Sequence, residues 1–215
     1  MASLGTKIRL LVLATCLCMA VSAMAHLLQD GDLLFCCSEA PNAITSVTSG
    51  IRDLPIDHVA VVHRIGGDGG PLFVIEAVKP VVCLTPIDTF LCRNTSDAVA
   101  HVLVGRVNVD CDIPASVRRC LAMVGRPYDD LYLPGDSAVY CSELVQMNYV
   151  TAAGTLVLDP VPMSFHDQSG AILQYWRDFY STRGLAVPEG EPGSNPGELS
   201  RRNQVTIIGK YPRQL

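Results

Sequence analysis

Residues 56–78 read IDHVAVVHRIGGDGGPLFVIEAV, and they carry the clearest fold signal in the chain. Two runs rich in β-branched residues, 56–65 and 72–78, flank a glycine-rich segment at 66–70. Glycine adopts positive φ without steric cost, so this segment favours a tight turn between two strands. The pattern predicts an antiparallel β-hairpin. Because side chains alternate along a strand, His58 and Val59 should lie on opposite faces.

One charged residue, Glu76, lies inside the second apolar run. A carboxylate buried there requires a partner. His58 and Glu76 are 10 and 8 residues from Asp68, near the centre of the turn, so they are expected to be opposite or diagonal neighbours across the hairpin. Two alternatives remain: Glu76 faces solvent on a half-exposed sheet, or Asp57 orients the histidine, although its side chain should point away from the His58 face.

The stretch YCSELV, residues 140–145, places Cys141 near the start of a predicted helix that begins at about Ser137 or Cys141 and runs to Ala153. A thiol is a strong nucleophile only as thiolate, and a helix N-terminus and a nearby imidazole both favour that form. We therefore take Cys141 as the candidate nucleophile and His58 as the best candidate base of five histidines. The alternative is a buried or disulfide-bonded structural cysteine.

The remaining pattern predicts an α+β domain with an antiparallel sheet and flanking helices. Further strands are expected at 31–36, 81–84, 101–107 and 204–210. Helices are expected at 42–49, 112–124 and 170–182, and Asp112 is suited to cap the second of them. Residues 186–198, rich in proline and glycine, are expected to form an irregular loop.

The first 25 residues have the anatomy of a secretory signal peptide, with Lys7 and Arg9 before an apolar run at 10–21 and Ala23 and Ala25 at the cleavage position. The run is too short to span a membrane, which takes about 20 residues. This predicts a signal peptide at 1–25, a single mature domain at 26–215, and a secreted or periplasmic location. Asn94 begins a glycosylation sequon, which matters only in a eukaryotic source.

The expected mature chain has 14 Lys and Arg against 21 Asp and Glu, an acidic balance that argues against a nucleic-acid partner. Nine cysteines become seven, and an odd number leaves at least one thiol unpaired. For an exported protein the favoured interpretation is three disulfides with Cys141 free. No cysteine or histidine spacing is typical of a zinc site, and we expect neither a metal nor a cofactor.

Five short motifs occur in an order that resembles the YiiX/YebB-like branch of the NlpC-type papain-like hydrolases. They are GDLLF at 31–35, DHVAVV at 57–62, VIEA at 74–77, GRPYD at 125–129 and YCSELV at 140–145. In that branch the fold is circularly permuted, so the histidine precedes the cysteine. The resemblance implies an antiparallel sheet or partial barrel packed against helices.

The resemblance also implies roles: Cys141 as nucleophile, His58 as base and Glu76 as orienter. It places Tyr140 beside the thiol, where its hydroxyl or the Cys141 backbone amide would help to bind an oxyanion. The leading hypothesis is a secreted thiol hydrolase that cleaves an amide bond in a cell-wall peptide or a lipid-like amide. The alternatives are a thiol-dependent lipid acyltransferase or phospholipase, and a non-catalytic binding domain on the same fold.

Overall fold

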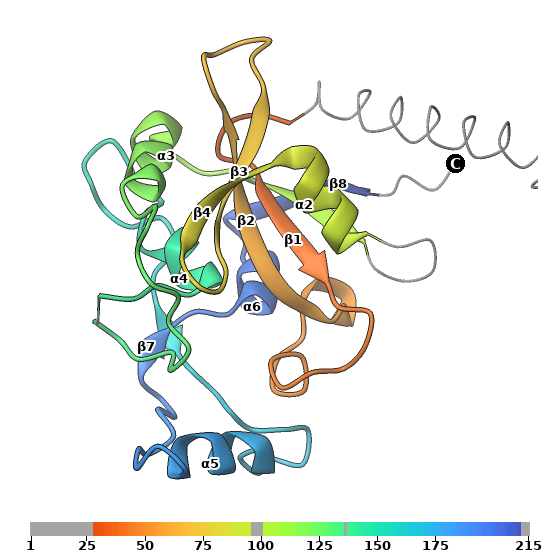
Figure 1. Cartoon of the computed structure of the whole chain (residues 1–215), viewed down its shortest axis with the longest axis vertical. Coiled ribbons are helices and arrows are strands. Elements are labelled where there is room, and N and C mark those ends of the chain that lie inside the picture. The colour runs from red at the N-terminus through yellow and green to blue at the C-terminus, as the bar shows by residue number, and fades with distance from the viewer. Residues whose placement is uncertain (1–27, 96–100, 136, 212–215) are drawn as a thin grey trace, which may run out of the picture.

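A six-stranded antiparallel sheet forms the centre of the protein in a computed structural model that describes residues 28–95, 101–135 and 137–211. Its strand order is β4-β3-β2-β1-β5-β8 (Figure 1). The strands are β1 (Leu33–Cys37), β2 (Ile56–Arg64), β3 (Leu72–Ala77), β4 (Val82–Pro86), β5 (Val102–Val107) and β8 (Val205–Tyr211). The predicted signal peptide and Ser96 of the sequon lie outside the described residues.

The predicted hairpin is confirmed as β2 and β3. Val61 pairs with Ile75 and Val62 with Val74, and the turn between the strands contains three glycines with positive φ. Only glycine reaches that conformation without strain, so the composition of the turn sets the register of the two strands.

Both faces of the sheet are buried, each against its own helices. Strand residues alternate, so Val59 and Val61 pack on one face while Ala60 and Val62 pack on the other. The second face is covered by α2 (Ile87–Asn94). The first face packs against α3 (Ile113–Leu121), α4 (Cys141–Gln146) and α6 (Pro196–Ser200), near the short 3-10 helix η1 (Ile51–Asp53). This is the predicted α+β arrangement of an antiparallel sheet with flanking helices.

A separate lobe lies below the sheet in Figure 1 and contains α5 (Gln174–Ser181). We call residues 163–191 the α5 lobe. It has its own aromatic cluster, built on Phe165, Trp176 and Tyr180. A two-stranded ribbon, β6 (Val161–Pro162) and β7 (Pro192–Gly193), lies at its base. The Trp176 indole donates to the Ala43 carbonyl at 3.1 Å and the Tyr180 hydroxyl to the Leu131 carbonyl at 2.8 Å, which ties the lobe to two loops.

Several predicted helices differ from the structure. Residues 43–47 form consecutive turns rather than the predicted helix at 42–49, although the Asn42 side chain accepts from the Ile44 and Thr45 amides as a helix cap does. The helix α4 ends at Gln146, well before Ala153. Asp112 does cap α3, accepting from the Ala115 amide at 2.9 Å.

Two α-helices were absent from the sequence prediction. α2 follows β4 directly, and α6 lies inside the segment predicted to be an irregular loop. Asn195 caps α6 by accepting from the Gly197 amide at 2.8 Å, and Pro196 supplies the fixed φ of the first helical turn. The proline that suggested a loop therefore starts a helix.

The predicted disulfides are wrong: all seven cysteines of the described residues are free. Cys36 and Cys37 are adjacent in β1 and so face opposite sides of the sheet. Cys120 lies in the core with its sulfur 3.8 Å from the Leu144 carbonyl, whereas the Cys83 sulfur lies 3.7 Å from the Thr85 hydroxyl on β4. The sulfurs are thus distributed among different elements. Within the described part of the chain, no helix is long and apolar enough to cross a membrane.

Candidate active site

Cys141 is the first residue of α4 and is buried. The residue before it, Tyr140, has extended backbone angles, so the chain turns into the helix at the cysteine. Leu144 and Val145 anchor α4 in the core beneath the sheet. The thiol therefore lies at the positive end of a helix held by its apolar face.

His58 lies beside a β-bulge in β2. The pairing with β1 passes from Cys36–His58 to Cys37–Ile56, which leaves Asp57 as the extra residue. Such bulges redirect the side chains around them. The Asp57 carboxylate accepts from the Asn42 side-chain amide at 2.6 Å, so it is engaged away from His58.

The His58 side chain joins the thiol to a buried carboxylate. Its Nε2 lies 2.9 Å from Glu76 Oε2, and the Cys141 side chain lies close enough to the imidazole to raise its pKa. Because Nε2 faces Glu76, Nδ1 is the nitrogen left for the thiol. The structure thus brings together the three residues that the sequence singled out, and their catalytic roles stay predictions.

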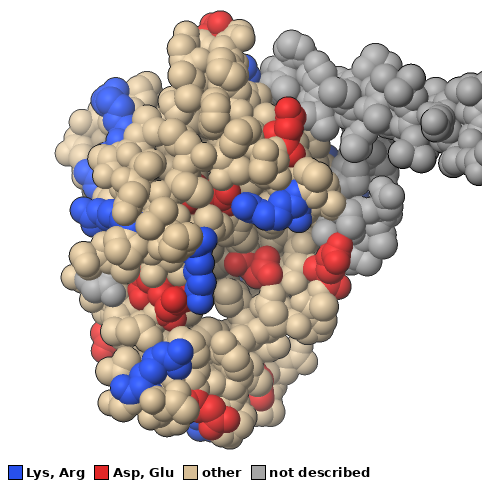
Figure 2. Space-filling model, viewed as in Figure 1, with Lys and Arg blue, Asp and Glu red and all other residues tan. Residues whose placement is uncertain are grey.

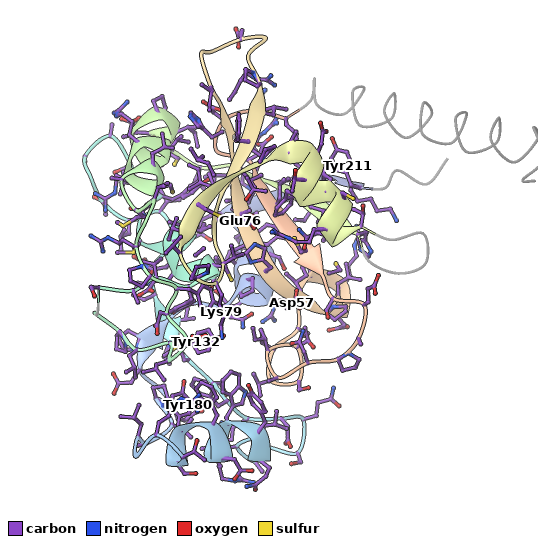
Figure 3. All side chains as sticks on the ribbon, viewed as in Figure 1. Asp57, Glu76, Lys79, Tyr132, Tyr180 and Tyr211 are labelled. Carbon is purple, nitrogen blue, oxygen red and sulfur yellow. The ribbon has the colours of Figure 1, made fainter. Side chains whose placement is uncertain are left out.

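Glu76 is fully buried in β3 and has three partners. Besides His58, its carboxylate accepts from the Thr85 hydroxyl at 2.6 Å and from Arg93 Nη2 at 2.6 and 2.9 Å. Burial alone would raise the pKa of Glu76, but its hydrogen bonds to His58 and Thr85 and the charges of His58 and Arg93 outweigh this and lower the pKa below its ordinary value of 4.5. Figure 3 shows Glu76 in the sheet and Asp57 well away from it.

Arg93 is a site residue that the sequence analysis missed. It lies on α2, a helix that was also missed, and its guanidinium stacks over the Phe90 ring at 5.6 Å. The available signal was the apolar spacing of Ile87, Phe90 and Leu91, which is typical of one helix face.

The imidazole of His58 is held in its charged form. Burial alone would lower its pKa, but hydrogen bonds and charges from Cys141 and Glu76 reverse the effect and raise the pKa from 6.5 to about 9. At neutral pH an imidazolium therefore lies beside the thiol, with a carboxylate behind it.

A second cysteine–histidine contact exists elsewhere, with Cys37 Sγ 3.4 Å from His101 Nε2. Burial and the nearby charge of Asp57 raise the pKa of Cys37 to about 11. Its thiol is therefore protonated at neutral pH and is a poor nucleophile. Neither of the two cavities beside the Cys141 site is lined by Cys37.

Two cavities flank the Cys141–His58 pair. The larger, about 350 Å³, is lined by Cys141, and the smaller, about 240 Å³, is lined by His58, Lys79 and Asp130. Tyr132 and Trp176 line both, and their rings meet edge to face at 5.7 Å. Figure 2 shows this hollow between the sheet and the α5 lobe, and Figure 3 shows Lys79 and Tyr132 between them.

Tyr140 borders the larger cavity with its hydroxyl already engaged. The hydroxyl oxygen accepts from the Ser194 amide at 3.0 Å, and burial raises the pKa of Tyr140 above its ordinary value of 10. The phenol is therefore neutral. Its expected part in binding an oxyanion stays a prediction, as does that of the Cys141 amide.

The histidine strand precedes the cysteine helix, and both lie at one end of an antiparallel sheet; this is the permuted papain-like fold. A family model described as "permuted papain-like amidase enzyme, YaeF/YiiX, C92 family" matches residues 27–208. The chain belongs to this family.

The fold is also similar to the crystal structure of metalloprotein yiiX from Escherichia coli O157:H7. The TM-score is 0.65 at 21% sequence identity, over 85% of this chain and 97% of the other. At that identity the likeness concerns the fold alone. No curated protein matches the chain.

The metal that the description of yiiX implies does not fit the described residues of this chain. Among them, no group of three or more His, Cys, Asp and Glu side chains is placed to hold a metal ion. At the site itself the Glu76 carboxylate already faces two cationic side chains, the His58 imidazolium and the Arg93 guanidinium. No step below involves a metal.

Proposed function

We propose that this protein is a cysteine hydrolase that cleaves an amide bond through an acyl-enzyme on Cys141. His58 acts as acid and base, and Glu76 orients the imidazole. The single observation that carries the proposal is the position of the His58 side chain, which lies close enough to the Cys141 side chain for the two to interact and whose Nε2 is 2.9 Å from the buried Glu76 carboxylate. Membership of an amidase family supports the reaction class.

In the proposed cycle His58 gives up one proton and later regains one. The Cys141 thiolate attacks the amide carbonyl carbon and forms a tetrahedral oxyanion. The His58 imidazolium then gives its Nδ1 proton to the amide nitrogen, the carbon–nitrogen bond breaks, and the free amine leaves a thioester on Cys141. Water, losing a proton to His58, attacks the thioester, and release of the acid restores the thiolate–imidazolium pair.

The oxyanion requires donors beside the thiol. The first backbone N–H groups of a helix have no partner within the helix, and Cys141 is the first residue of α4. We propose the Cys141 amide as one donor, with the neutral Tyr140 hydroxyl as a candidate for the other.

The two cavities suggest how the substrate lies. The acyl half stays bonded to Cys141, so the larger cavity should receive it, whereas the amine takes its proton from His58 and should leave through the smaller one. A cell-wall peptide and a lipid-like amide are both candidate substrates. The signal-peptide pattern supports action outside the cytoplasm, in a secreted or periplasmic setting.

Lipid acyl transfer or phospholipid hydrolysis is the second candidate function. The observation that favours it is the apolar wall of the larger cavity, which includes Ile44, Val47, Met163, Phe165 and Trp176. A hydrocarbon chain would bury its surface there. The same thiol and imidazole would then act on an ester.

The test is a comparison of the wild type with Cys141→Ala, using panels of peptide amides, lipid amides and phospholipids. The mature protein should release amine from an amide, and intact-mass measurement should find a transient acyl adduct on Cys141. Cys37→Ser is the matched control, because Cys37 also contacts a histidine. Turnover that survives in Cys141→Ala, or that disappears in Cys37→Ser, would contradict the proposal.

A further inference from the structure

The smaller cavity beside His58 has a wall of aromatic rings. Three of them, Tyr128, Tyr175 and Phe179, line this cavity and not the larger one. In the proposed reaction the amide nitrogen takes its proton from His58, which lines the smaller cavity as well. Whatever group the nitrogen carries must therefore lie among these rings.

The rings on α5 form one continuous surface. Tyr175 and Phe179 lie one helical turn apart and stack at 6.0 Å with 22° between their planes. The Trp176 ring meets both edge to face, at 5.0 and 5.7 Å. Tyr175 is 52% exposed, so much of its ring remains available for contact. An aromatic guest gains ring–ring contacts there beyond the burial of its surface, whereas a saturated ring gains only the burial.

The same cavity also has a charged part. Its charged lining, among the described residues, consists of Lys79, Asp130 and His58. Lys79, which follows β3, pairs with Asp130 in the loop after α3, and both side chains are well exposed. An exposed pair contributes little to stability, so Lys79 can take up another anion at small cost. With the His58 imidazolium the lining has two positive groups and one negative group, which favours an anionic guest over a cationic one.

We infer that the amine half of the substrate is an aromatic amino acid, whose side chain lies among Tyr175, Trp176 and Phe179 and whose carboxylate pairs with Lys79. The substrate is then an N-acyl aromatic amino acid, which water converts to the free acid and the free amino acid. This rests on the proposed function and names the leaving group that it leaves open. A cationic amine would be repelled by Lys79, and a plain alkyl amine would match neither the rings nor the charge.

The test uses three amides of hexanoic acid that differ only in the amine: L-phenylalanine, L-cyclohexylalanine and phenethylamine. The second replaces the phenyl ring by a saturated ring, and the third lacks the carboxylate. Mass spectrometry of the released amine gives kcat/KM. For the wild type we expect kcat/KM of the phenylalanine amide to be about tenfold above that of the cyclohexylalanine amide. It should be about threefold above that of the phenethylamine amide.

The Lys79–Asp130 pair allows a test of sign. In Lys79→Gln the carboxylate of the substrate faces Asp130 alone, so the preference over the phenethylamine amide should be lost or reversed. In Asp130→Asn no anion competes for Lys79, so the same preference should increase about threefold. A purely structural pair predicts that both variants act alike, since each breaks the same contact. Lys210→Gln, at an exposed position of β8, is the matched control and should leave the preference unchanged.

Tyr175→Leu tests the aromatic wall, because it keeps an apolar side chain and removes one ring. The ratio of the phenylalanine amide to the cyclohexylalanine amide should fall about threefold. Leu185→Ala, at an exposed position of the α5 lobe that lines neither cavity, should leave the ratio unchanged. Equal kcat/KM for the three amides in the wild type would overturn the inference. So would a carboxylate preference that moves in the same direction in Lys79→Gln and Asp130→Asn.

Binding to Cys141→Ala separates this inference from the proposed function. Calorimetry with N-hexanoyl-L-phenylalanine and N-hexanoylphenethylamine measures the cavity without any turnover. Tighter binding of the amino-acid amide, without Cys141-dependent hydrolysis in the wild type, would support the inferred leaving group and contradict the nucleophile. Cys141-dependent hydrolysis with no preference among the three amines would support the nucleophile and contradict the aromatic amino acid.

Discussion

Arg93, on α2, donates from Nη2 to both oxygens of the Glu76 carboxylate, at 2.6 Å to one and 2.9 Å to the other. The histidine lies on the same carboxylate, 2.9 Å from Oε2. Glu76 is therefore a buried anion shared by two cationic side chains. One of them faces the thiol and the other, about half exposed, faces solvent. The helix α2, which carries none of Cys141, His58 and Glu76, thus supplies the arginine that holds the Glu76 carboxylate in place beside His58.

Arg93→Gln should lower kcat/KM about tenfold, the equivalent of ~1.4 kcal/mol for one lost charge-assisted hydrogen bond. Burial favours the neutral carboxyl of Glu76, and Arg93 is one of the charges that oppose it. Without Arg93 the pKa of Glu76 rises, so the acid limb of the pH–rate profile should move to higher pH. Arg93→Lys keeps the charge, so its acid limb should move to higher pH by less than that of Arg93→Gln.

Arg183→Gln is the matched control for that experiment. Arg183 also stacks on an aromatic ring, with its guanidinium 3.8 Å from the Phe179 centroid, but it lies on the α5 side of the molecule. Its replacement should leave the pH–rate profile unchanged. An acid limb that does not move in Arg93→Gln would show that Arg93 has no influence on the carboxylate.

The site divides into a part that local sequence pattern predicts and a part that it does not. The glycine turn at 66–70 fixes the β2–β3 register, and the register brings His58 and Glu76 together. Arg93 reaches Glu76 only because α2 folds back over the sheet. That placement is a long-range packing result, and no spacing rule within residues 82–94 encodes it.

Cys141→Ala should lower the pKa of His58 from about 9. Burial favours the neutral imidazole, and Cys141 and Glu76 are the groups that oppose it. Removing the thiol leaves Glu76 alone against burial, so His58 should titrate at lower pH. The measurement is an NMR titration of the His58 ring in both proteins. An unchanged midpoint would mean that the thiol and the imidazole do not form a coupled pair in solution.

The same raised pKa predicts how stability depends on pH. A group whose pKa is higher in the folded state stabilises the protein fully below its unfolded pKa, and the effect is lost as pH rises through the folded pKa. For His58 the window runs from 6.5 to about 9, and the loss should approach about 3 kcal/mol. Urea unfolding at intervals from pH 6 to 10 measures it. His58→Gln should flatten this part of the curve.

The cysteines of the described chain should all react as free thiols. Unfolded protein prepared without reductant should bind seven equivalents of a thiol reagent over residues 28–211. In the folded protein the exposed Cys92 should react readily, so labelling of Cys141 is best followed in a Cys92→Ser background. Burial raises the pKa of Cys120 to about 12 and that of Cys37 to about 11, which should make both slow. Fewer than seven equivalents would reveal a disulfide.

The disulfide prediction shows what counting cysteines cannot supply. An odd number of cysteines and a predicted export signal are compatible with three bridges, but pairing requires two Cβ atoms about 4 Å apart. Cys36 and Cys37 are separated by the alternation of β1, and Cys120 faces α4 across the core. The positions of the strands and helices therefore decide the pairing.

Tyr132 forms the partition between the two cavities in a conformation that favours glycine. Its φ is 52°, in the left-handed region, and its ring makes edge contacts with Tyr140 at 5.2 Å and Trp176 at 5.7 Å. Tyr132→Gly loses both aromatic contacts, each worth roughly 0.5–1.5 kcal/mol. It also relieves about 1 kcal/mol of backbone strain. The lost burial and contacts of a large aromatic side chain cost about 3–5 kcal/mol in total, so after the relieved strain the free energy of unfolding should fall by about 2–4 kcal/mol.

Tyr132→Gly should also change the choice of leaving group, because the substitution joins the acyl cavity to the amine cavity. Amides of one acid with ammonia, 4-nitroaniline and 7-amino-4-methylcoumarin would measure the effect on the leaving group. We expect kcat/KM for the bulky amines to rise relative to ammonia, since the ring no longer confines them. Tyr132→Asn, which tolerates the same backbone conformation with a smaller side chain, should behave alike. Trp176→Ala is a poorer probe, because it removes the centre of the lobe's aromatic cluster and should cost about 3–5 kcal/mol. If the relative kcat/KM values of the three amides are the same in Tyr132→Gly as in the wild type, Tyr132 does not separate the two halves of the substrate.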